Sequence, residues 1–199
     1  MAKPLSTLLS SKPAPPGGAT TTAAPSGDAM FGFLDDCHRE MQRQLGLLAA
    51  LARDIETDGL TPVVRARVRE VQTWFNVQAR EHHLDEEHNV FPALLASADD
   101  EVVQAARRLT QDHAWLETDW MEIEPSLAAA ADGYTWFDPA VLRYAVEVFQ
   151  QLYLDHIVLE ETLAYPAARS AIPQAEIAAM GVEMARRRAL RETRTVRRS

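Results

Sequence analysis

The stretch His82–Pro92 reads HHLDEEHNVFP, and the chain repeats its pattern at His156–Pro166 as HIVLEETLAYP. Both copies follow His-x3-Glu-Glu-x3-aromatic-Pro, and a phenylalanine, Phe75 or Phe149, stands seven residues before each histidine. A His and a Glu four residues apart lie on one face of a helix, one turn from each other. We interpret the two copies as two halves of one metal site.

Helical periodicity continues on both sides of these motifs. Apolar residues recur at three- and four-residue steps over about 30–56, 61–92, 99–125 and 138–166, and no alternating strand pattern is found. The pairs Thr61-Pro62 and Asp138-Pro139 are typical helix starts. We therefore predict an all-α fold, an up-down-up-down four-helix bundle with an additional C-terminal helix and a disordered N-terminal tail.

Prolines are expected to interrupt these helices. A proline lacks the backbone N–H and clashes with the preceding turn. The pattern therefore predicts that Pro92 ends or kinks the second helix and that Pro166 does the same in the fourth. Pro125 is expected to kink the third helix or to end its first part.

Composition divides the chain into three segments. Residues 1–27 are a Pro/Ala/Thr-rich tail with few large apolar side chains, which predicts disorder. Residues 28–172 form the predicted bundle, and residues 173–199 form a predicted basic C-terminal helix. The basic segment 186–199 holds seven arginines and one glutamate and could contact an acidic partner.

Charge and hydropathy exclude several classes of protein. Residues 29–172 carry 25 acids and 11 bases, which argues against nucleic-acid binding. No apolar run reaches the roughly 18 residues that would predict a membrane span. The single cysteine, Cys37, cannot form an internal disulfide, which is typical of a cytoplasmic protein.

Each bundle helix carries one histidine on its apolar stripe, and two of the helices add a glutamate one turn later. Imidazole with carboxylate suits iron or manganese, whereas structural zinc favours thiolates. Neighbours one residue off the stripe, namely His83, Glu87 and Glu161, are expected to turn toward a flank or solvent, and His88 toward the surface. The predicted metal ligands are His38, His82, Glu86, His113, His156 and Glu160.

These motifs resemble the hemerythrin-like, HHE cation-binding family over roughly residues 30–170. The resemblance implies a four-helix bundle with a non-haem di-iron centre, open to an oxide or hydroxide bridge, on the six ligands above, with manganese as the less favoured metal. Oxygen-carrying hemerythrins have one more histidine and an aspartate where this chain has Glu117 and Glu161. Glu117 is therefore a candidate additional ligand or a partner of the ligands.

The resemblance implies a protein that binds or senses O2, NO, or iron and redox state. An enzyme with peroxidase-like or nitric-oxide-handling activity is the main alternative, and a metal-free interaction bundle is a further one. We favour the binding protein over the enzyme, although one sequence does not choose between them. The incomplete histidine set argues against pure O2 storage.

Overall fold

The computed structural model describes residues 29–196, with side chains through residue 190, so the predicted tail at 1–27 lies outside the described residues. All regular elements in the described part are helical, which confirms the all-α prediction. The elements in chain order are α1 (Ala29–Asp58), α2 (Pro62–Trp74), η1 (Phe75–Ala79), α3 (Arg80–Asn89), α4 (Phe91–Leu95), α5 (Asp100–Asp132), α6 (Pro139–Leu159), η2 (Glu160–Ala164), α7 (Tyr165–Ala171) and α8 (Gln174–Val196).

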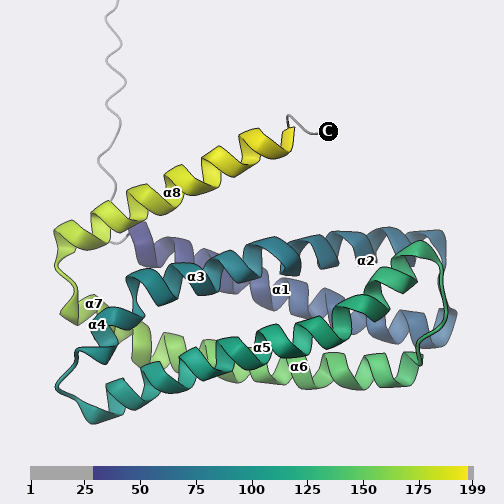
Figure 1. Cartoon of the computed structure of the whole chain (residues 1–199), viewed down its shortest axis with the longest axis horizontal. Coiled ribbons are helices and arrows are strands. Elements are labelled where there is room, and N and C mark those ends of the chain that lie inside the picture. The colour runs from purple at the N-terminus through teal and green to yellow at the C-terminus, as the bar shows by residue number, and fades with distance from the viewer. Residues whose placement is uncertain (1–28, 197–199) are drawn as a thin grey trace, which may run out of the picture.

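Four rods lie side by side and antiparallel to their chain neighbours (Figure 1). The rods are α1, α2 continued by η1 and α3, α5, and α6 continued by η2 and α7. Helix α1 packs against α2 and α6, and α5 packs against the same two helices, which closes the bundle. The fifth long helix, α8, packs on the outside of α1. Within the described residues, no helix is long and apolar enough to cross a membrane.

The two predicted helix starts are present, and a glycine ends α5. The Thr61 hydroxyl accepts a hydrogen bond from the backbone N–H of Val64 at 3.2 Å, and the Asp138 carboxylate accepts one from Ala140 at 2.9 Å. Each bond satisfies a backbone N–H that the first helical turn leaves free. Helix α5 ends at Gly133, whose φ of 87° lies in the left-handed region that glycine adopts without strain.

The prolines act in three different ways. Helix α5 continues through Pro125 to Asp132, so the predicted end of the helix at this proline is wrong, whereas the alternative of a kink stays a prediction. Pro125 is exposed, so water can bond the carbonyl that the ring leaves without a partner. The second rod does break just before Pro92, at Val90, whereas at Pro166 the fourth rod continues by way of the π-helix η2.

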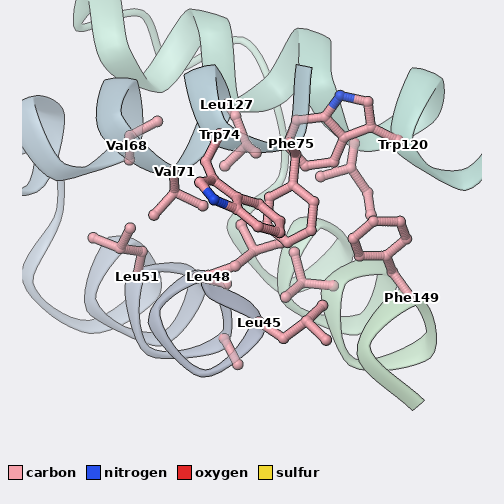
Figure 2. Packing of buried hydrophobic residues seen from close by; sticks show 14 of the residues in the cluster. Leu45, Leu48, Leu51, Val68, Val71, Trp74, Phe75, Trp120, Leu127 and Phe149 are labelled. Atoms are coloured by element: carbon pink, nitrogen blue, oxygen red, sulfur yellow. The ribbon is translucent and has the colours of Figure 1, made fainter. Parts of the chain in front are cut away.

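The core consists of two apolar clusters with a polar layer between them. One cluster is built around Phe75, Trp120 and Phe149, which Figure 2 shows packed with leucines and valines of α1 and α2. The other is built around Phe31 and Tyr165 near the start of α1. Along each rod, the histidines and glutamates of the sequence motifs fall at the boundary of these clusters.

Candidate metal centre

The polar layer contains all six predicted ligands, and none of them is more than 5% exposed. Helix α1 supplies one histidine, α3 a histidine and a glutamate, α5 one histidine, and α6 with η2 a histidine and a glutamate. Such burial is costly for acids and imidazoles unless they are paired or bind an ion. The six residues are His38, His82, Glu86, His113, His156 and Glu160.

Each glutamate lies between two histidines from different helices. The Oε1 atom of Glu86 is 3.3 Å from His82 Nε2, and its Oε2 atom is 3.4 Å from His113 Nε2. The Oε1 atom of Glu160 is 3.2 Å from His156 Nε2, and its Oε2 atom is 3.1 Å from His38 Nε2. Each carboxylate thus directs one oxygen toward the pair His38 and His82 and the other toward the pair His113 and His156, which we call the two halves of the layer.

These spacings fit donor atoms around shared ions. Two donors bound to one ion at about 2.1 Å lie roughly 3.0–3.4 Å apart, depending on the coordination geometry. The facing atoms also lack hydrogen-bond partners: Nε2 of His82, His113 and His156, Oε2 of Glu86, and both carboxylate oxygens of Glu160. Buried polar atoms are normally hydrogen-bonded, so such a concentration of unpaired donors and acceptors calls for a ligand.

Two overlapping groups of four residues result from these positions. One group is His38, His82, Glu86 and Glu160, and the other is Glu86, His113, His156 and Glu160. In each group the candidate ligand atoms lie within 4.8 Å of one another. Because both glutamates belong to both groups, the layer has the composition of a two-ion site with shared carboxylates.

His83 does not lie where the helical register predicts. It was expected on a flank or in solvent, but its ring stacks on His113 with a centroid distance of 4.0 Å. One of its nitrogens also belongs to a third close group, with His113 and His156. The Tyr153 hydroxyl lies 3.2 Å from its Nε2 atom. The sequence signal was present in the doubled histidine HH, but register alone pointed the ring outward.

Glu87 and Glu161, the second glutamate of each copy, contact the layer from outside. His113 Nδ1 donates a hydrogen bond to Glu87 at 2.8 Å, and His38 Nδ1 donates one to Glu161 at 3.0 Å. Both carboxylates are part-exposed, as expected, but each also contacts a histidine of the layer. An acceptor on Nδ1 fixes the imidazole so that the Nε2 lone pair faces the layer.

The aromatic residue of each copy covers one of these histidines. Phe91 stacks on His113 and Tyr165 stacks on His38, at centroid distances of 5.3 Å in both cases. The Tyr165 hydroxyl donates a short hydrogen bond to Glu86 Oε1, an interaction that phenylalanine cannot make. The two copies therefore both place an aromatic ring on a histidine but differ in polarity, whereas the sequence pattern showed only that the position is aromatic in both.

The two π-helical segments occupy different places in the two copies. The first, η1, precedes His82, and the second, η2, begins at Glu160. A π turn inserts an extra residue into a helix and rotates the side chains after it, and such turns are frequent at functional sites. Both π turns thus lie within one or two turns of the candidate ligands.

Charge interactions inside the layer shift several pKa values. Burial lowers the pKa of His156, but the charge of Glu160 and the nearby Asp112 outweigh burial and raise the pKa to about 10. Burial raises the pKa of Glu86, and the charge of Glu160 adds to this effect. Burial and the charge of His38 hold the pKa of His82 well below its ordinary value. An incoming cation would replace the proton on His156, so uptake should release protons and weaken as pH falls.

The structure does not bring Glu117 into any of the three groups. Its carboxylate is half-exposed and pairs with Arg80, with 2.8 Å between Arg80 Nη2 and Glu117 Oε1. Asp112, which no sequence argument singled out, is 1% exposed and lies 3.8 Å from His156 Nδ1. Asp112 is therefore nearer to the layer than Glu117 is.

Part of the basic C-terminal segment has a partner within the chain. Arg187 Nη2 lies 2.7 Å from Oδ1 of Asp85, a buried acid next to Glu86, and Arg188 Nη2 lies 3.8 Å from Oδ2 of the same residue. These ion pairs link α8 to α3. The acidic partner expected for this segment is thus supplied, for two of its arginines, by the bundle itself.

A helical bundle with a buried layer of paired histidines and glutamates defines a class of metal-binding protein. The chain matches the hemerythrin HHE cation binding domain over residues 29–168 and belongs to that family. It is also similar to an uncharacterized protein of Haemophilus influenzae, with 28% identity over 156 residues that cover 78% of this chain and 88% of the relative.

Proposed function

We propose that the protein holds two iron ions in the polar layer and uses them to bind or sense O2, NO, or the iron and redox state of the cell. The observation that carries the proposal is the position of Glu86 and Glu160, each of which directs its two oxygens toward histidines of opposite halves. Manganese is the less favoured metal, because imidazole nitrogens suit iron, whereas manganese prefers oxygen donors.

His38 and His82 would hold one ion, and His113 and His156 the other. If each glutamate gave one oxygen to each ion, each ion would receive two nitrogens and two oxygens from the chain, and about two positions of an octahedral ion would stay open to small ligands. Bound iron would supply one-electron redox chemistry and affinity for diatomic molecules. The chain supplies the dry surroundings and the fixed imidazoles.

The two halves would not be equivalent. We propose His83 as an additional nitrogen donor on the His113 side, since its ring nitrogen lies in a close group with His113 and His156. Glu117 is then better explained as the ion-pair partner of Arg80 than as a ligand. Loss of about half of the bound metal in His83→Ala would support this assignment, and unchanged metal content would contradict it.

Anaerobic purification with iron quantitation and absorption spectroscopy tests the proposal directly. We expect about two irons per chain, near-complete loss of iron in His82→Ala and Glu86→Ala, and no loss in the matched control His88→Ala. His88 is exposed, and its Nδ1 atom lies 2.6 Å from the Leu84 carbonyl oxygen. Equal iron content in all four proteins would rule out the site and favour a metal-free interaction bundle.

An enzyme with peroxidase-like or nitric-oxide-handling activity is the second candidate. The observation that favours it is the buried Tyr165 hydroxyl, which donates to Glu86 inside the layer and could supply a proton there. Titration of the reduced protein with O2, peroxide and NO separates the candidates. An O2-dependent absorption band that reverses under vacuum indicates binding, whereas irreversible oxidation with peroxide turnover indicates an enzyme. A cytoplasmic location stays a prediction.

A further inference from the structure

A cleft opens between α3 and α5 and ends at the polar layer. Its volume is about 640 Å³. Four aromatic residues from η1, α5 and α6 form its floor, and two histidines of α3 and α5 close its inner end. These six residues are Phe75, Trp120, Phe149, Tyr153, His83 and His113.

The volume of this α3–α5 cleft is far greater than a diatomic molecule requires. A water molecule takes up roughly 30 Å³ of liquid, and a cavity of about 150 Å³ already accepts benzene. Pockets for small organic ligands typically measure roughly 300–1,000 Å³. The cleft therefore has room for an organic molecule of one or two rings beside the polar layer.

The floor favours an aromatic ligand. The ring of Phe75 lies 4.9 Å from Trp120 and 5.5 Å from Phe149 between centroids, and Figure 2 shows these three rings next to one another. Trp120, 8% exposed, is the most accessible of these rings, and Phe75 and Phe149, at most 2% exposed, pack behind it in the core. An aromatic ligand would therefore pack against the Trp120 ring in a tilted or offset arrangement. The Trp120 N–H is already bonded to Asn76 at 2.7 Å, and the Tyr153 hydroxyl to His83, so the floor offers mainly apolar contact.

The rim of the cleft selects against anions. Glu87, Glu117 and Glu124 lie along it, and Arg80, which pairs with Glu117, is the basic residue among the cleft's lining. The acids outnumber the base, so a carboxylate or phosphate on the ligand would meet like charge, which lowers affinity. Leu84 and Met121, 49% and 62% exposed, extend the apolar surface to the mouth.

We propose that the α3–α5 cleft binds a neutral or cationic aromatic molecule of one or two rings, with one end against His83 and His113. This inference goes beyond the proposed function, which requires only a diatomic ligand or peroxide. The floor and the rim are built from residues outside the ligand groups, whereas the inner end, formed by His83 and His113, is shared with the proposed metal centre.

Calorimetric titration with three probes of the same shape tests the chemistry of the ligand: 2-naphthol, 2-naphthylmethylamine and 2-naphthoate. The protein is used as purified, with its iron content measured. We expect the neutral and cationic probes to bind with a Kd of roughly 1 mM or tighter and the carboxylate at least about tenfold more weakly. Equal binding of all three probes, or no binding of any, would overturn the proposal.

A plugged variant tests the location. Ala114 is exposed and lines the cleft on α5, so Ala114→Trp fills the mouth without disturbing the core. We expect at least a tenfold loss of affinity, whereas the matched control Ala66→Trp, at an exposed alanine of α2 outside the cleft, keeps the affinity of the wild type.

A charge reversal tests the rim. Glu117→Lys should remove most of the discrimination against 2-naphthoate, since it replaces an acid with a base beside Arg80. Unchanged discrimination, or unchanged binding in Ala114→Trp, would contradict the proposal. Iron content serves as the separate readout for the metal centre, because neither Ala114 nor Glu117 lies in its ligand groups.

Discussion

Each glutamate between the two halves has a neighbour that holds a histidine from another helix. Glu86 lies in the layer while Glu87 accepts from His113, and Glu160 lies in the layer while Glu161 accepts from His38. Consecutive residues of a helix point about 100° apart. In each Glu-Glu pair, the first side chain can therefore face the layer, and the second can orient a histidine of a neighbouring rod.

Removing these outer acceptors should weaken metal binding without removing a ligand. We expect Glu87→Ala or Glu161→Ala to lower the affinity for Fe(II) by about 10- to 100-fold, because the imidazole loses its fixed orientation and part of its basicity. Competition with a chelator of known affinity measures the effect. Glu70→Ala, at an exposed acid of α2, is the control. Wild-type affinity in both variants would contradict the assigned role.

At the scale of elements, α8 is attached to the bundle by close packing at one glycine. A Cβ atom added to Gly181 would lie 2.9 Å from the backbone nitrogen of Met30 and 3.0 Å from the Cβ of Ala29. Ile177 and Met184, on either side, are fully buried against the start of α1. The α1–α8 contact therefore depends on the missing side chain.

Two glycine substitutions should have opposite effects on stability. Gly181→Ala forces α8 away from α1 and should lower the free energy of unfolding by roughly 1–3 kcal/mol. Gly46→Ala, in the middle of α1 with no atom within 4 Å of the added Cβ, should raise it by about 0.5–1 kcal/mol. Urea denaturation followed by circular dichroism measures both values. Stabilisation by Gly181→Ala would show that α8 does not pack as described.

At the scale of the whole molecule, the polar layer is the one place where all four rods contribute buried charged or titratable groups to a single cluster. The statement applies to residues 29–190, whose side chains are described. Without an ion the layer keeps unpaired donors and acceptors in the interior, which is unfavourable. Metal binding and the stability of the whole bundle should therefore be coupled.

Removal of metal should destabilise the protein as a unit. An ion present at about 100 times its Kd stabilises the folded state by roughly 2.7 kcal/mol. We expect a chelator to lower Tm, and restored Fe(II) to raise it again. A double variant, His82→Ala with Glu86→Ala, should show no response to either treatment. A Tm that is the same with and without chelator in the wild type would disprove the coupling.

The sequence by itself determined that the fold is all-helical and where two capped helices begin. It also determined that the six predicted ligands lie on the apolar stripes of their helices. These features are local, since they depend on a 3.6-residue period, on the side chain before a helix and on a spacing of four. The repeat of His and Glu then predicted that two helices contribute equivalent pairs. Their role as ligands stays a prediction, although the structure places all six together.

Only the tertiary structure decided which side chains outside the stripe reach the layer. The helical period placed His83, Glu87 and Glu161 on a flank or in solvent, but the neighbouring rods lie close enough that these side chains contact His113 and His38. The contact of Arg187 with Asp85 joins residues far apart in the chain and has no local signal. The motif HHLDEEHNVFP specifies the side chains that its helix presents, whereas the packing of the other rods specifies the groups that each presented side chain contacts.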